Sequence, residues 1–145
     1  MKLRRTTVLS GIENALRKKI IPLLADDFAR NEVHLAASLI GIDCAGRDEE
    51  VALLVEEQDR IRALFAEAAG KVGDAALANR LSEMAKAKPD DLRMGALMEA
   101  TARLRDLLVE LHIYVESQDE QWASELDRAI WRLIRDNESA RNPKP

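Results

Sequence analysis

Apolar residues recur every three or four positions along most of this chain, and no segment alternates apolar and polar residues as a strand does. A period close to 3.6 residues places apolar side chains on one face of an α-helix, whereas a half-buried strand has a period of two. The sequence therefore predicts an all-α fold without strands, arranged as an antiparallel helical bundle of five to six helices.

The first helix is predicted to span residues 7 to 24. Pro22 lacks an N–H group and disfavours helical geometry at Ile21, so this helix should kink or end there. Asp26 and Asp27 can each accept a backbone N–H group and are suited to begin the next helix. The apolar positions expected to face inward on the first helix are Val8, Ile12, Leu16, Ile20 and Leu23.

Residues 27 to 69 keep one apolar register, which passes through Gly41 and Gly46. Two interpretations follow: one long bent helix, or two helices broken near residues 44 to 48, with Asp48 capping the second. We favour the break. The inward positions of this segment are Val33, Ala37, Ile40, Cys44, Val51, Leu54 or Val55, Gln58, Ile61, Phe65 and Ala68.

In the second half of the chain, Asp74 is predicted to cap a short helix over residues 75 to 87. Asp90 or Asp91 is predicted to cap a longer helix that ends near Ser117. This longer helix has an apolar stripe of heptad character and is expected to be the central one. The stripe consists of Met94, Leu97, Thr101, Leu104, Leu108, Leu111 and Val115.

The connection that follows is short enough for an αα-hairpin, so the last helix should run antiparallel to its neighbour. Asp119 is predicted to cap this helix, which should reach about Glu138. Residues 139–145 contain two prolines and are expected to form a flexible tail, leaving residues 1–138 as a single helical-bundle domain. The expected inward positions of the last helix are Trp122, Leu126, Ala129, Ile130, Leu133 and Ile134.

The cysteine content and the longest apolar runs predict a soluble cytoplasmic protein. Cys44 is the one cysteine among 145 residues, which excludes an intramolecular disulfide. Residues 1–12 contain no signal-like apolar run. No apolar stretch approaches the roughly 18 residues that a membrane span requires.

The charge balance argues against a nucleic-acid partner, because 22 basic and 26 acidic side chains give a net charge of -4. The first 22 residues are an exception, with six basic side chains and one acidic side chain. Within them Arg17, Lys18 and Lys19 form a candidate basic contact surface for phosphate or an acidic partner, and the competing interpretation is an ordinary solvated face.

Motifs for catalysis and for metal binding are missing from the sequence. Di-metal helical bundles use Glu-x-x-His pairs, and neither His34 nor His112 has a glutamate three residues before it. The glycines do not form a phosphate-binding loop. We therefore expect no catalytic residue, no metal site and no cofactor.

The run LRKKIIPLL at residues 16–24, followed by ARNEVHLAASLIGI at residues 29–42, resembles the opening of small uncharacterised bacterial all-helical proteins. In that family an aliphatic-Pro-aliphatic step precedes an Ala-rich helix. Some members are encoded near acyl-CoA dehydrogenase-like and phosphotransferase-like enzymes, so the resemblance implies an accessory role. The family has no assigned catalytic residues to transfer to this chain.

The plentiful apolar stripes predict a non-catalytic protein that acts through protein contacts, as a homo-oligomer such as a dimer or as an accessory subunit of a metabolic enzyme. The alternative is a small-molecule-binding or weakly catalytic bundle with a pocket between helices. The residues expected to line that pocket are His34, Met94, Met98, His112, Trp122 and Trp131.

Overall fold

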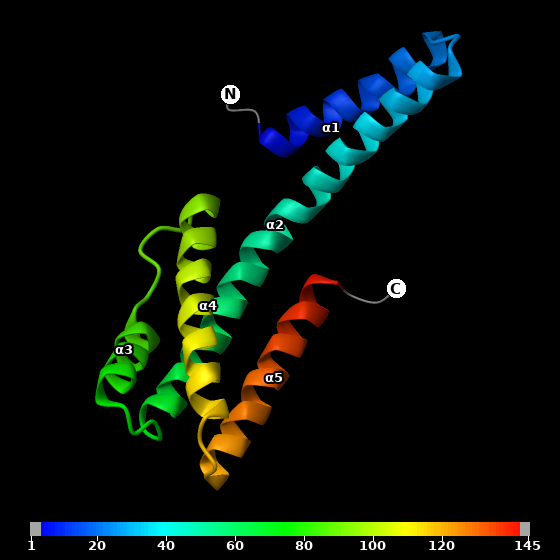
Figure 1. Ribbon diagram of the computed structural model, residues 1–145. Coiled ribbons are helices and arrows are strands. Elements are labelled where there is room, and N and C mark those ends of the chain that lie inside the picture. Colours follow the sequence, from blue (N-terminus) through cyan, green and yellow to red (C-terminus); the bar gives the residue numbers. More distant parts are fainter. Residues whose placement is uncertain (1–3, 143–145) are drawn as a thin grey trace. The chain divides into compact units, whose positions relative to one another are not determined.

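The computed structural model describes residues 4–142, apart from the side chains of residues 47 and 48. This range is mostly helical and contains no strand (Figure 1), so the predicted all-α class is confirmed. By its internal contacts the chain forms two compact units, residues 1–50 and residues 51–145. The single domain over residues 1–138 stays a prediction.

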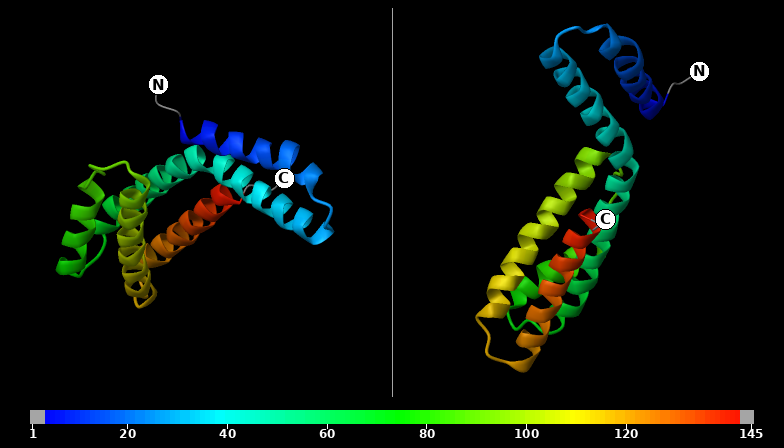
Figure 2. Two further views of the ribbon diagram at one scale, coloured as in Figure 1. Left: turned by 90° about the horizontal axis from the view of Figure 1, so that it is seen from above. Right: turned by 90° about the vertical axis from the view of Figure 1, so that its right-hand side faces the viewer.

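In the first unit, α1 (Arg5–Ala15) and the beginning of α2 (Asp27–Ala69) lie side by side as a helical hairpin (Figure 2). A π-helical turn, η1 (Leu16–Ile20), and a 3-10 turn, η2 (Ile21–Leu23), join them. Pro22 lies in the 3-10 turn, so helical geometry changes at the predicted place. Asp26 caps α2 as predicted, because its Oδ2 accepts the N–H of Ala29 at 2.8 Å.

The favoured break near residues 44–48 is wrong, since α2 is continuous. A break would leave the N–H and C=O groups of two new helix ends without helical partners, whereas a glycine inside a helix costs only about 1 kcal/mol relative to alanine. Gly41 serves another purpose. A Cβ atom there would lie 2.9 Å from Oε1 of Glu13, so this glycine allows α1 to approach.

The second unit packs the last part of α2 against α3 (Ala75–Lys86), α4 (Met94–Glu116) and α5 (Gln121–Arg141). α4 and α5 run antiparallel, and α3 lies beside α4 (Figures 1 and 2). Side chains from all four helices and from the turn after α2 form one core, which contains Ile61, Leu64, Phe65, Ala68, Val72, Leu77, Leu81, Leu104, Leu107, Leu108, Leu111, Val115, Ala123, Leu126, Ile130 and Leu133.

The predicted inward stripes hold for this second unit and fail for α1. Gln58 and the α4 positions from Leu97 to Val115 are buried as predicted, although Ile134 is exposed. Val8 and Ile12 on α1, and Ile20 and Leu23 in the turns after it, are exposed, contrary to the prediction. Within the described part of the first unit, the beginning of α2 packs against one side of α1, and the other side of α1 faces away from it.

Helix ends follow the predicted caps only in part. Asp74 accepts the N–H of Leu77 at 2.9 Å and caps α3 as predicted. The caps predicted for α4 and α5 are wrong, because these helices begin after Arg93 and Glu120 without a side-chain cap. Before α4, Oδ1 of Asp91 instead accepts the N–H of Arg93 at 2.9 Å and turns the chain ahead of the helix.

α5 also continues past the predicted end at Glu138. Its last turns are anchored on α2, where Nη1 of Arg60 donates to Oδ1 of Asn137 at 3.0 Å and Arg141 pairs with Glu57. The helix therefore extends to Arg141. The remainder of the predicted tail, residues 143–145, lies outside the described residues.

Among the described residues, none of the helices combines the length and the hydropathy that a bilayer-spanning segment requires.

Candidate functional site

The six residues predicted to line a pocket are divided between the two units. His34 lies on α2 in the first unit and is exposed, while the other five lie in the second unit. Two of those five are in contact. The rings of His112 and Trp131 have their centroids 5.2 Å apart and are inclined at 80°, which is an edge-to-face arrangement.

The structure does not join Met94 or Met98 to this ring pair. Met98 lies fourteen residues before His112 on α4, which corresponds to about 21 Å along the helix axis. Trp122 lies at the start of α5, where its Nε1 donates to Oε2 of Glu120 at 2.5 Å. The described contacts therefore bring together only two of the six predicted residues.

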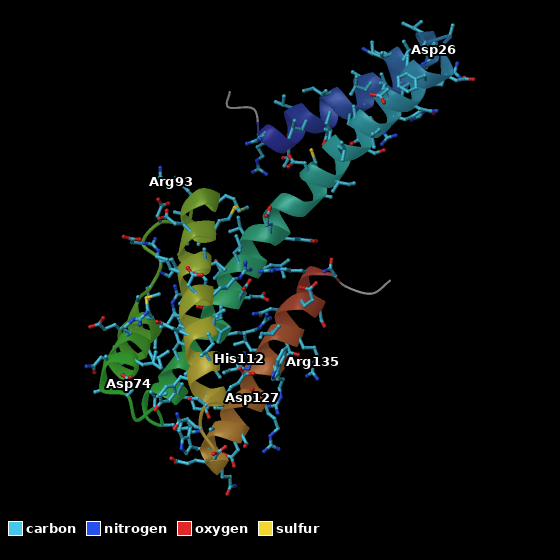
Figure 3. All side chains as sticks on the ribbon, viewed as in Figure 1. Asp26, Asp74, Arg93, His112, Asp127 and Arg135 are labelled. Carbon is cyan, nitrogen blue, oxygen red and sulfur yellow. The ribbon has the colours of Figure 1, made fainter. Side chains whose placement is uncertain are left out.

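His112 is the centre of a polar cluster between α4 and α5. Its Nε2 lies 2.8 Å from Oδ1 of Asp127 and 3.7 Å from Oε1 of Glu116, one turn further along α4. Figure 3 shows His112 and Asp127 on these two neighbouring helices. One ligand atom from each of the three side chains lies within 4.8 Å of the others. We name these three residues the His112 cluster.

A groove of about 560 Å³ adjoins the His112 cluster at the hairpin end of α4 and α5. Glu116 and Asp127 lie on its wall, so two of the three clustered side chains border open space. The groove is lined by Val115, Glu116, Gln118, Ala123, Ser124, Asp127 and Arg128.

The His112 cluster does not contain the Glu-x-x-His metal motif, which has a glutamate three residues before the histidine. The structure instead uses a glutamate four residues after His112, on the same face of α4. The third side chain, Asp127, comes from the next helix. An i, i+4 pair followed by a short antiparallel connection is the signal that would have found it.

A second polar group lies inside the core, where Gln58 on α2 meets Thr101 on α4. Nε2 of Gln58 donates to Oγ1 of Thr101 at 2.9 Å and to the carbonyl of Leu97 at 3.1 Å. Oε1 of Gln58 accepts from Nη2 of Arg62 at 2.9 Å. Gln58 and Thr101 are almost fully buried, and their hydrogen bonds hold α2 and α4 in register.

The three residues of the candidate basic contact surface differ in their contacts. Nε of Arg17 donates to Oε1 of Glu13 at 3.0 Å, and its Nη2 donates to Oγ of Ser38 at 3.2 Å. Arg17 therefore joins α1 to α2 within the hairpin. Lys18 and Lys19 are exposed.

The first part of α2 has apolar side chains on two opposite faces. Ala37 is fully buried on the face toward α1. On the other side Phe28, Leu35, Leu39 and Ile42 are 72%, 59%, 58% and 68% exposed. We name these four residues the uncovered face. Their spacings of seven, four and three residues give a single seam along the helix.

Gly46 continues this seam four residues after Ile42. A Cβ atom added at Gly46 would meet nothing within 4 Å, in contrast to Gly41. Packing among the described residues thus gives no reason for glycine at this position, although glycine weakens a helix interior by about 1 kcal/mol relative to alanine. The seam of the uncovered face therefore ends at a position without a side chain, which we call the notch.

Comparison of the chain with protein-family models, with curated proteins and with solved structures found no match.

Proposed function

We propose that this protein is a non-catalytic protein that works as a homodimer, in which the uncovered face of α2 packs against the same face of a second copy. One observation supports this most strongly: four large apolar side chains form a seam opposite the face that α1 already covers. A helix with apolar residues on opposite sides is typical of one that is buried on both sides. Apolar patches of this kind on a protein surface favour protein contacts.

The spacing of the seam favours a second copy as the partner. The steps from Phe28 to Leu35 and from Leu39 to Gly46 are both seven residues. If two copies pack antiparallel about a two-fold axis with Leu35 opposite Leu39, Phe28 of one copy comes opposite Gly46 of the other. The Phe28 side chain then fills the notch at Gly46. The two-fold axis gives the dimer two equivalent copies of this contact.

A size-exchange experiment tests this pairing. Phe28→Ala removes the large side chain and Gly46→Phe fills the notch, so each change alone should weaken the dimer by about tenfold or more. The combined variant moves the large residue from one end of the seam to the other and should recover much of the lost affinity. Light scattering after size exclusion, over a range of concentrations, gives the dissociation constants.

Gly46→Phe should fold normally, because a Cβ atom at this position meets none of the described residues within 4 Å and phenylalanine has a higher helix propensity than glycine. Single variants that dimerise like the wild type would contradict the proposed contact. A combined variant that is weaker than both single variants would contradict the proposed register.

A further inference from the structure

The His112 cluster presents one imidazole nitrogen and two carboxylates to a common point. Zinc is bound in proteins by these donor types at about 2.0–2.2 Å, and a tetrahedral site with such bonds holds its ligand atoms about 3.4 Å apart. The distances from Nε2 of His112, 2.8 Å to Asp127 and 3.7 Å to Glu116, lie on either side of that separation. All three ligand atoms lie within 4.8 Å of one another, so modest side-chain shifts would bring them to the separation that zinc requires.

The backbone positions of the three residues are fixed by the core. His112 directly follows the buried Leu111 on α4, and Asp127 directly follows the buried Leu126 on α5. The ring of Trp131, one turn after Asp127, packs edge-to-face with the ring of His112. The two ligands from different helices are thus held in place before any ion binds, which favours binding.

The groove beside the cluster leaves room for a further ligand. Zinc sites with three protein ligands keep a fourth position for water or a small molecule. Arg128 also lines this groove, but its Nε donates to the carbonyl of Ser124 at 3.2 Å, which holds the guanidinium along its own helix.

We propose that the His112 cluster binds one zinc ion, through Nε2 of His112 and one carboxylate oxygen each of Asp127 and Glu116, with the fourth position open to the groove. Calcium and magnesium fit less well, because calcium takes six to eight oxygen ligands and magnesium takes an octahedral set of oxygens. Histidine nitrogen and carboxylate oxygen are both ligands of protein-bound zinc.

Isothermal titration of the full chain with zinc chloride tests the site. We expect one ion bound per chain, and a loss of affinity of more than about tenfold in His112→Asn. His34→Asn is the matched control, because His34 is the other histidine of the chain and lies in the first unit; this variant should bind zinc like the wild type. Absence of binding in the wild type, or loss in His34→Asn with retention in His112→Asn, would overturn the proposal.

A second variant separates metal binding from folding. His112 also bonds to Asp127 across two helices, so His112→Asn could alter the fold itself. Glu116 is 61% exposed and lies 3.7 Å from His112, so Glu116→Gln should fold normally. Zinc should raise the Tm of the wild type, and the rise should be clearly smaller for Glu116→Gln. Equal Tm shifts in the two proteins would overturn the proposed ligand set.

Discussion

Oε1 of Glu57 on α2 lies 2.6 Å from Nε of Arg105 on α4. The other carboxylate oxygen of Glu57 accepts from Arg105 at 2.8 Å and also contacts Arg141 at the end of α5. One carboxylate, only 6% exposed, therefore links three helices of the second unit.

Glu57→Ala should destabilise the protein by about 1–3 kcal/mol. Breaking a buried ion pair costs roughly 3–5 kcal/mol, and the exposure of both arginines lowers that figure, because water replaces part of the lost interaction. Chemical denaturation gives the free energy of unfolding. Glu56→Ala is the control, since Glu56 pairs with Arg60 at the surface and its loss should cost less than about 1 kcal/mol. Equal effects of the two changes would contradict a special role for Glu57.

Gln58→Ala should cost about 2–4 kcal/mol, because it leaves a cavity and removes the buried hydrogen bonds to Thr101 and the Leu97 carbonyl. Gln58→Leu should cost less, since leucine preserves most of the volume. Chemical denaturation of both variants gives their free energies of unfolding. Asp59→Ala is the reference, because Asp59 is the exposed neighbour of Gln58. If Gln58→Ala were as mild as Asp59→Ala, the buried polar contact would not stabilise the core.

Asp74→Ala should lower the free energy of unfolding by about 1 kcal/mol, because it removes the acceptor for the N–H of Leu77 at the start of α3. Asp74→Asn should be nearly neutral, since asparagine caps helices about as well. Thermal unfolding of both variants separates the cap from the charge: a loss in Asp74→Asn equal to that in Asp74→Ala would show that the charge alone matters.

Asp91 should titrate below the ordinary aspartate pKa of 3.8. The hydrogen bond from the Arg93 side chain lowers the pKa of Asp91, and the backbone N–H of Arg93 lowers it further. A folded-state pKa below the unfolded one means that this contact stabilises the protein above about pH 4 and is lost as the pH falls through the folded pKa. NMR titration of the carboxyl carbon should show this pKa rising toward 3.8 in Arg93→Gln; an unchanged value would contradict the pairing.

Some features carried by a single helix could be predicted from the sequence, although the caps of α4 and α5 and the inward stripe of α1 could not. Asp74 as a cap and the stripe from Leu97 to Val115 depend on local spacing, which the chain shows directly. The contacts of Glu57 and the pairing of His112 with Asp127 depend on which helix faces meet, and spacing within one helix does not contain that information. The helix break predicted near Gly46 is wrong for another reason. In a sequence, a glycine that ends a helix cannot be distinguished from a glycine on the surface of a continuous helix.

Sedimentation equilibrium of the unmodified chain and of Leu39→Glu shows whether the uncovered face forms the proposed dimer. Leu39 lies in the middle of the uncovered face, and a buried carboxylate there would be left unpaired in the dimer. Ile113→Glu is the control, because Ile113 is similarly exposed, at 63%, on α4. The proposed dimer implies the mass of two chains for the unmodified protein and for Ile113→Glu, and the mass of one chain for Leu39→Glu. An unmodified protein that keeps the mass of one chain at every concentration measured would contradict it.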